Sequence, residues 1–347
     1  MIQWTQAIPA LTDADIGFNV GALGDQFWEL TFRGLEWGAI YALVAVGYTL
    51  VYGVLRLINF AHSEIFMVGL FGQYAALMMF GFAPTAKTYQ QGTLLTIMFL
   101  LGAMIIGMLV SGGVAVGLER VAYRPLRRRN APSLVFLITA IGASFVLQEF
   151  VHFVLPHLTG NKLGGVNAQQ PIKLVQQKLE FTAGGGRIYN VTMIMVVAAL
   201  VLAIGTDIFI NRTRFGRAIR AVAQDPTTAT LMGVSRERVI VLTFFIGGVL
   251  AGAAALLFTL IPPGYGGIVY SGGFLLGIKA FCAAVLGGIG NLRGALLGGL
   301  LLGVVEKWGQ VLFGNQWKDV IAFVLLVLIL MLRPTGLLGE KLGRARA

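Results

Sequence analysis

The chain has 347 residues, of which 57% are hydrophobic and only 12% are charged, whereas a soluble domain is about half apolar and about a quarter charged. This composition excludes a water-soluble globular protein, and the high hydrophobicity also excludes a disordered chain. An integral membrane protein remains, so the formal net charge of +11 indicates topology rather than nucleic-acid binding.

The N-terminal region is acidic. The first 32 residues contain four acidic residues and no Lys or Arg, so the basic start of a signal peptide is missing. We predict that residues 1–34 form an acidic extension on the periplasmic side. The single cysteine, Cys282, excludes an intramolecular disulfide and a metal cluster built on cysteines.

Nine apolar segments follow, each long enough or nearly long enough to cross a bilayer. Because they are continuous rather than alternating, they predict helices and not the strands of a membrane barrel. We therefore expect an all-α, polytopic membrane protein with 8–10 spans and a best value of nine. The glycine-rich eighth segment predicts a broken or re-entrant helix, and a short extra helix over Gly21 to Phe32 is an alternative start. The nine segments are Leu35–Leu55, Phe60–Phe82, Thr93–Leu118, Ser133–Leu155, Val191–Ile210, Val239–Ile261, Ser271–Ile289, Gly294–Val305 and Val320–Leu332.

The basic residues fall mostly on one side of the nine-span arrangement. If the loop from Glu119 to Pro132 is cytoplasmic, 17 Lys and Arg residues lie on the cytoplasmic side and 7 on the other. This asymmetry predicts an external N-terminus and a cytoplasmic C-terminus, with residues 340–347 as a basic cytoplasmic tail.

Two loops are long. The external stretch from Pro156 to Asn190 is polar and would cover the outer mouth or meet an external partner. The internal stretch over residues 211–238 predicts two short helices, Arg217–Ala223 and Thr227–Met232, separated by Asp225-Pro226 and closed by Gly233. Such a hairpin is either a docking element or a basic anchor for acidic lipid headgroups.

The most polar intramembrane cluster is the stretch from Asn59 to Glu64. Polar groups at membrane depth are costly unless they are paired or face water, which makes them functional candidates. Asn59, His62 and Ser63 share one helical face approximately. The alternative is that Asn59 caps the second span while His62 and Glu64 lie in headgroup water.

Lys279 lies well inside an apolar segment and needs a carboxylate partner or a wet cavity. Glu64 and Glu306 are the two candidate partners. Other polar residues lie nearer the predicted ends, where we expect interface residues rather than ligands; they are Glu36, Gln73, Gln148, Glu149, Asp207, Glu306 and Lys307.

Glycine is abundant, at 47 residues. Small residues let helix backbones approach closely, so packing is the simple interpretation of Gly287, Gly288 and Gly290. A hinge for alternating access is the other interpretation. The glycines after Gly288 have the wrong spacing for a nucleotide-binding loop, and the sequence contains no phosphate loop and no H-E-x-x-H motif.

Several strings resemble one known family. Gly47 to Gly53 with Leu57 to Glu64 resembles the first motif of the LivH-type permeases of branched-chain amino acid ABC importers. Further matching strings follow in the same order through the chain, and they are Glu119–Leu126, Gly216–Ala221, Leu231–Val234, Lys279–Gly290 and Arg333–Gly339. The resemblance covers about Leu35 to Gly339, which we take as the permease domain.

The resemblance implies a bacterial inner-membrane permease without its own ATPase site. It implies a homologous LivM-type permease, two cytoplasmic ABC ATPases and a periplasmic amino-acid-binding protein as partners, with membrane lipid around them and no nucleic acid. It implies no cofactor on this chain, because the ATPases hydrolyse the ATP. Leu, Ile and Val as substrates come from the resemblance alone.

The family pattern also gives the internal hairpin a role as the helix that docks into the ATPase. This chain keeps the glycine of the E-A-A-x-x-x-G pattern but not its glutamate. We expect Arg217, Arg220, Ala229, Leu231 and Gly233 to transmit the ATPase motion. For the translocation pathway or its gate, our candidates are Asn59, His62, Glu64 and Lys279.

Three alternatives stay open. A sibling ABC permease would carry urea, short amides or other amino acids. An ion-coupled secondary transporter would use Glu64 or Glu306 as its intramembrane acid. A membrane enzyme would need a convergent set of nucleophile, base or metal ligands, and the sequence shows none.

Overall fold

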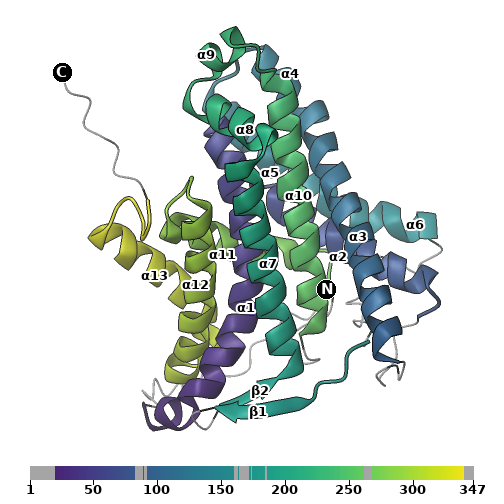
Figure 1. Cartoon of the computed structure of the whole chain (residues 1–347), viewed down its shortest axis with the longest axis vertical. Coiled ribbons are helices and arrows are strands. Elements are labelled where there is room, and N and C mark those ends of the chain that lie inside the picture. Colours follow the sequence, from purple (N-terminus) through teal and green to yellow (C-terminus); the bar gives the residue numbers. More distant parts are fainter. Residues whose placement is uncertain are drawn as a thin grey trace, which may run out of the picture.

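The computed structural model describes residues 20–82, 89, 92–159, 163, 172, 174–183, 186–261 and 268–339. Most of the predicted acidic extension and the predicted basic tail lie outside these residues. The described part is helical apart from one hairpin, and most of its long helices run along the long axis of the molecule (Figure 1). The long helices are α1 (Val20–Leu55), α2 (His62–Met79), α3 (Thr93–Leu118), α5 (Ser133–Glu149), α7 (Asn190–Arg212), α10 (Arg236–Leu260), α11 (Gly272–Gly287), α12 (Leu292–Phe313) and α13 (Lys318–Leu332).

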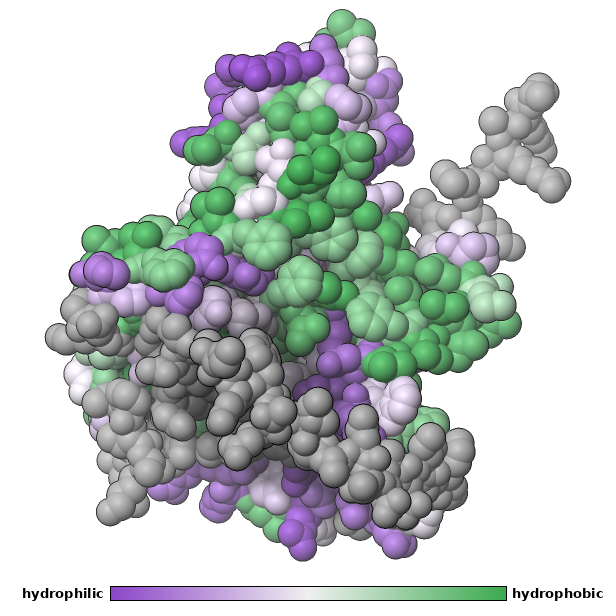
Figure 2. Space-filling view, turned by 180° about the vertical axis from the view of Figure 1, so that it is seen from behind, coloured by the Kyte–Doolittle hydropathy of each residue, from purple (hydrophilic) through white to green (hydrophobic). Residues whose placement is uncertain are grey.

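Each of the nine predicted segments corresponds to one of these helices, which confirms the all-α membrane fold. Within the described residues, seven helices are long and apolar enough to cross a membrane. Of the other two, α11 has only 16 residues, and α2 begins with the polar residues His62, Ser63 and Glu64. Seen from behind, green hydrophobic surface fills much of the band between a purple upper end and a purple lower end (Figure 2).

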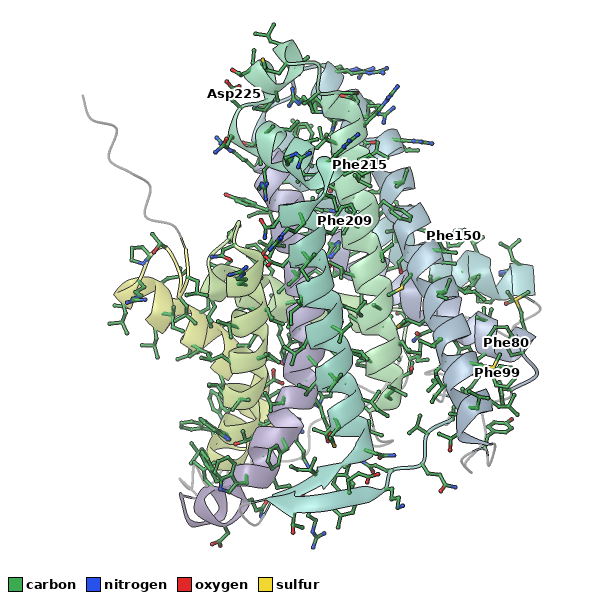
Figure 3. The ribbon with its side chains drawn as sticks, viewed as in Figure 1. Phe80, Phe99, Phe150, Phe209, Phe215 and Asp225 are labelled. Atoms are coloured by element: carbon green, nitrogen blue, oxygen red, sulfur yellow. The ribbon has the colours of Figure 1, made fainter. Side chains whose placement is uncertain are left out.

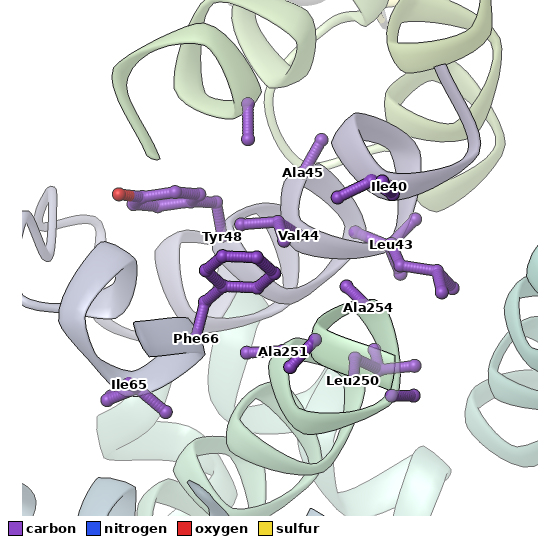
Figure 4. Packing of buried hydrophobic residues seen from close by; sticks show 14 of the residues in the cluster. Ile40, Leu43, Val44, Ala45, Tyr48, Ile65, Phe66, Leu250, Ala251 and Ala254 are labelled. Carbon is purple, nitrogen blue, oxygen red and sulfur yellow. The ribbon is translucent and has the colours of Figure 1, made fainter. Parts of the chain in front are cut away.

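Helix α1 forms the centre of the bundle. It is one continuous helix of 36 residues, so the predicted short helix over Gly21 to Phe32 is its first part. Every residue from Gly38 to Val51 is buried. Val44 and Tyr48 of this stretch pack with Phe66 of α2 and Leu250 of α10 in the hydrophobic core (Figure 4). A membrane helix buried on all sides is positioned by protein contacts rather than by lipid.

Small residues bring α1 and α12 together. Gly34, Gly38 and Ala42 recur every fourth residue on α1, and they face Gly299 and Gly303 of α12. A Cβ atom added at Gly38 would lie 2.8 Å from the Cα atom of Leu300, so side chains at these positions would push the helices apart.

The prediction of a broken or re-entrant eighth segment is wrong, because α12 is continuous over 22 residues. Its glycines fit close contacts with α1 and α11 rather than a break. In α11 the glycines do the same: a Cβ atom at Gly287 would overlap the backbone of Gly294.

A second glycine contact joins α3 and α10. A Cβ atom at Gly252 would lie 2.6 Å from the carbonyl oxygen of Gly107, and one at Gly248 would lie 2.7 Å from the Cβ atom of Ala115. Both major helix contacts of the bundle therefore depend on missing side chains.

The two ends of the bundle differ. At the lower end in Figure 1, β1 (Leu179–Ala183) and β2 (Gly186–Tyr189) form an antiparallel pair inside the predicted external loop. Gly186 of this hairpin lies directly against Trp28 of α1. At the upper end lie the short helices α4 (Arg124–Arg128), α8 (Arg214–Gln224) and α9 (Pro226–Leu231).

The last described residues of the chain pack against the C-terminal end of α11. The backbone N–H groups of Leu337 and Leu338 donate to the carbonyl oxygens of Leu286 and Gly287, at 2.8 and 3.0 Å. The side chain of Asn291 donates to the carbonyl oxygen of Leu338 at 2.8 Å. Carbonyl groups at a helix C-terminus need such partners, because the helix itself provides none.

Candidate functional site

The polar cluster at the start of α2 is buried in protein. Asn59, His62, Ser63 and Glu64 are each at most 5% exposed. The prediction that Asn59 caps the helix is wrong, because the N-cap residue is Ala61 and no side chain caps the helix. Asn59 instead accepts a hydrogen bond of 2.6 Å from the hydroxyl of Tyr123. The alternative with His62 and Glu64 in headgroup water is likewise wrong.

His62 faces a gap left by two glycines. A Cβ atom at Gly47 of α1 would lie 2.5 Å from Nε2 of His62, and one at Gly247 of α10 would lie 3.5 Å from its Cε1 atom. The ring packs edge-on against Tyr48, with 4.7 Å between the ring centroids. Among the described residues Nε2 has no hydrogen-bond partner, so the imidazole keeps one free polar atom at the junction of three helices.

A small pocket opens beside this cluster, lined by residues of α1, the 57–59 turn and α11. It includes Tyr48, Thr49, Asn59 and Phe281. Among the described residues, Thr49 Oγ1 and Asn59 Nδ2 have no hydrogen-bond partners. Unsatisfied polar atoms are rare in buried positions, and two of them border this pocket.

Glu64 is fully buried, and its two oxygens differ. Oε1 accepts hydrogen bonds from Gln148 at 3.0 Å and from Ser144 at 3.2 Å, both on α5. Oε2 has no partner and points at the first turn of α11, where a Cβ atom at Gly273 would lie 2.8 Å away.

Lys279 forms a separate network. Its Nζ atom lies 2.9 Å from Glu306 Oε1 and 2.7 Å from Asp319 Oδ1. The hydroxyl of Tyr41 donates to the other oxygen of Glu306 at 3.0 Å. Of the two predicted partners, Glu306 is therefore confirmed and Glu64 is wrong. The network joins α1, α11, α12 and α13.

The interface interpretation is wrong for Glu36, Gln73, Glu306 and Lys307, which are buried. Glu36 accepts a hydrogen bond from Thr192, Gln73 donates to the carbonyl of Ala255 at 2.7 Å, and Lys307 donates to Gln310 at 2.9 Å. The partners of Glu36 and Gln73 lie on helices far away in the sequence, so no local sequence pattern predicts that these two residues are buried. Glu149, in contrast, is exposed and lies 3.1 Å from His152.

The predicted pair of short helices in the internal loop is confirmed. Thr213 caps α8 by accepting from the N–H of Gly216 at 3.0 Å, and Asp225 caps α9 by accepting from the N–H of Thr227 at 2.9 Å. Asp225 also accepts a bond from the hydroxyl of Thr228. Gly233 ends the hairpin at φ +85°, a conformation that glycine adopts without strain.

The hairpin is attached at its base and bare at its tip. Arg220 donates to Asn211 at 2.6 Å, and Arg56 donates to the carbonyl oxygen of Ala223 at 3.3 Å. Ala229 is buried, whereas Leu231 and Met232 are 83% and 81% exposed. Figure 3 shows Asp225 in the upper part of the molecule, above Phe215.

Two further exposed side chains, both on α8, complete this surface. Arg217 and Phe215 both point outward. The helix α8 therefore presents one buried apolar face, which includes Ile219 and Val222, and one basic face. This division is typical of a helix that lies flat on a larger body.

A charged network that sequence analysis missed braces the same end. Glu119, fully buried, lies 2.7 Å from Arg127 and 3.1 Å from Arg124. Arg127 also lies 2.7 Å from Glu237 at the start of α10. The network ties the segment after α3 to the helix that directly follows the hairpin.

Gly287, Gly288 and Gly290 form the turn between α11 and α12. Gly288 and Gly290 have φ values of +105° and +99°, which other residues rarely adopt. A Cβ atom at Gly288 would lie 2.5 Å from the backbone nitrogen of Gly339.

Comparisons with known proteins agree on one family. The sequence model of the branched-chain amino acid transport system permease component matches residues 30–330. The chain belongs to this permease family.

Individual permeases are similar over nearly their whole length. The high-affinity branched-chain amino acid permease protein BraD of Pseudomonas aeruginosa is 41% identical over 89% of this chain and 94% of its own. LivH of Escherichia coli strain K12 is 39% identical over 90% of this chain and 96% of its own. A probable LivH permease of Methanocaldococcus jannaschii is 27% identical over 89% and 94%.

The matched range of the permease family includes both intramembrane networks and the internal hairpin. Within this permease, Tyr41, Tyr123, Ser144 and Asp319 are the partners that sequence reasoning missed. Each binds a group at least 40 residues away in the chain, so no spacing rule pairs them. Asp319, an acid at the start of an apolar segment, is the one residue with a local signal.

Proposed function

We propose that this chain is the permease subunit of an ATP-driven importer and forms half of a translocation pathway for branched-chain amino acids. The observation that carries the proposal is the sequence identity of 39–41% to LivH and BraD over about nine-tenths of the chain. The chain would hydrolyse no ATP itself. Its partners would be a homologous LivM-type permease, two cytoplasmic ATPases and a periplasmic amino-acid-binding protein.

The basic upper end in Figure 1 would face the cytoplasm, with an external N-terminus and an internal C-terminus. In support, the exposed arginines of α8 and α4 gather at this end, in keeping with the excess of Lys and Arg in cytoplasmic loops. The membrane would be the bacterial inner membrane.

The hairpin α8–α9 would dock into the ATPase. Leu231 and Met232 form an exposed apolar tip, and a soluble partner would bury it. Ala229 and Gly233 shape the tip, while Arg217 and Arg220 lie on α8, with Arg220 bonded to Asn211 at the base of the hairpin. Arg56 connects the end of α8 to the end of α1, which gives motion at the hairpin a direct route to the central helix.

Asn59, His62 and Glu64 would line the pathway, because each keeps an unpartnered polar atom although buried. Lys279 would hold α11, α12 and α13 together rather than contact solute, since two carboxylates already surround it. Gly287, Gly288 and Gly290 would form the hinge about which α11 and α12 move.

The first experiment is affinity purification of the tagged chain in mild detergent, with identification of the co-purifying chains. We expect two ATP-binding chains and a second permease, and ATP-dependent leucine uptake after reconstitution with the binding protein. A chain that purifies alone and transports in ATP-free proteoliposomes would overturn the proposal.

The hairpin is tested in the same preparation with Leu231→Asp, which changes an exposed residue and leaves the core intact. Loss of the ATPases from the purified complex is expected. Val121→Asp is the matched control, because Val121 is also an exposed apolar residue near this end. Equal recovery of ATPases with both variants would refute docking through α9.

A further inference from the structure

Glu64 is a buried carboxylate without a countercharge. Among the residues that the structure describes, no Lys, Arg or His forms a salt bridge with it, and its hydrogen bonds all go to Oε1. Oε2 is left unpartnered. An unpaired carboxylate is costly at membrane depth, so a site that keeps one is suited to receive a cation.

The free oxygen points at a helix N-terminus. Helix α11 has 16 residues and begins at Gly272, and the side chain of Ser271 does not cap it. A Cβ atom at Gly273, in the first turn, would lie 2.8 Å from Oε2 of Glu64. The N–H of Gly272 already donates to the carbonyl oxygen of Val269 at 3.1 Å, but the next N–H groups of this turn have no intrahelical acceptor and carry partial positive charge, so the turn is suited to receive an anion.

A cation acceptor and an anion acceptor therefore lie side by side. In an α-amino acid, the ammonium and carboxylate groups are attached to the same carbon, which matches two acceptors in direct contact. We propose that Glu64 Oε2 binds the α-ammonium group of the transported amino acid while the first turn of α11 binds its α-carboxylate. This inference rests on the proposed function and names the groups of this chain that would hold the two charged ends of the substrate.

Met67 is an apolar neighbour of this position. The same Cβ position at Gly273 lies 3.0 Å from the Cβ atom of Met67 on α2, and Gly277 one turn later contacts Ser63. In this conformation α11 covers Oε2, so binding requires α2 and α11 to separate. The glycine face of α11 offers no interlocking side chains against that movement.

Direct binding tests the proposal without the periplasmic protein, which has its own specificity. The complex of both permeases and the ATPases is placed in lipid nanodiscs with radiolabelled leucine. Two competitors each lack one charged group: 2-hydroxy-4-methylpentanoate lacks the ammonium, and 3-methylbutylamine lacks the carboxylate. We expect wild type to prefer leucine over each by at least about tenfold, because one charge-assisted contact is lost.

Glu64→Gln is expected to weaken leucine binding by about tenfold or more and to bring the ratio of leucine to hydroxy-acid affinity close to one. Glu36→Gln is the matched control, because Glu36 is another buried carboxylate with a hydroxyl partner, and it should keep the wild-type ratio. An unchanged ratio in Glu64→Gln overturns the proposal, as does a wild-type complex that transports leucine but does not discriminate between the three compounds.

Gly273→Ala covers the case in which Glu64→Gln fails to assemble, since it keeps the carboxylate and places a methyl group against it. Loss of leucine binding in an assembled Gly273→Ala complex supports the site, and unchanged binding overturns it. A wild-type complex that takes up no leucine even with ATP and the binding protein would instead contradict the proposed function.

Discussion

Two buried carboxylate clusters meet α11, and they are built differently. Glu306 has Lys279 at one oxygen and the Tyr41 hydroxyl at the other. Glu64 has two hydrogen-bond donors within 3.2 Å at one oxygen and none at the other. The two buried acids therefore differ in unfilled hydrogen-bonding capacity rather than in burial.

Lys279→Met is the change with the largest expected effect on this comparison. It leaves Glu306 and Asp319 close together without their shared cation, and breaking a buried pair costs about 3–5 kcal/mol. We expect a strongly lowered melting temperature in detergent and poor assembly. The double variant Lys279→Met with Glu306→Gln should recover part of the loss, and a single variant as stable as wild type would show that the network is not structural.

Glu119→Gln extends the comparison to the upper end of the molecule in Figure 1. Glu119 is buried between Arg124 and Arg127, so removing its charge should cost about 2 kcal/mol. Glu237 remains as a partner of Arg127 and limits the damage. Thermal melting measures the loss, and Glu180→Gln in the exposed hairpin serves as the control. A cost equal to that of the control would contradict a bracing role.

Glu64→Gln should reduce the stability much less than Lys279→Met, which sharpens the contrast between the two carboxylates. The amide keeps an oxygen for Ser144 and Gln148, and the lost oxygen has no partner. We expect a change of about 1 kcal/mol or less, measured by the same melting assay. A loss as large as that of Lys279→Met would mean that Oε2 is already satisfied and would remove the contrast.

Asp225 gives the smallest effect and a pH dependence. Hydrogen bonds from Thr228 and from the backbone of Thr227 hold the pKa of Asp225 below its usual value. A depressed carboxyl pKa stabilises the fold above the ordinary value and loses that contribution as pH falls through the folded value. Amide exchange in α9 should therefore accelerate below about pH 4, relative to Asp225→Asn. Identical profiles for the two proteins would contradict the capping role.

Local features of the sequence predicted the fold well. Asp225-Pro226 and Gly233 mark the ends of α9 because a cap, a proline and a left-handed glycine each act on neighbouring residues. The apolar pattern of the eighth segment ends at Val305, because the charged residues Glu306 and Lys307 follow it. The helix continues to Phe313, since Lys279 and Tyr41 neutralise and bind Glu306 from other helices.

The candidate site was predictable only in part. Asn59, His62 and Glu64 stand out because polar residues are rare within spans. Their partners do not, because Tyr123 and Ser144 are ordinary in their own segments and meet the cluster only through tertiary packing. The position of Asn59 just before the second span is typical of a helix cap. In the structure its side chain instead accepts a hydrogen bond from Tyr123, which the sequence does not indicate.

The hydrogen bonds from Leu337 and Leu338 to the end of α11 also bear on how the chain is made. These residues leave the ribosome after α11 and α12 have been synthesised. Until then, the carbonyl groups of Leu286 and Gly287 lack these partners. Final docking of the α11–α12 pair must therefore await the synthesis of Leu338, and a ribosome stalled before Arg333 would hold a bundle in which the end of α11 is still open.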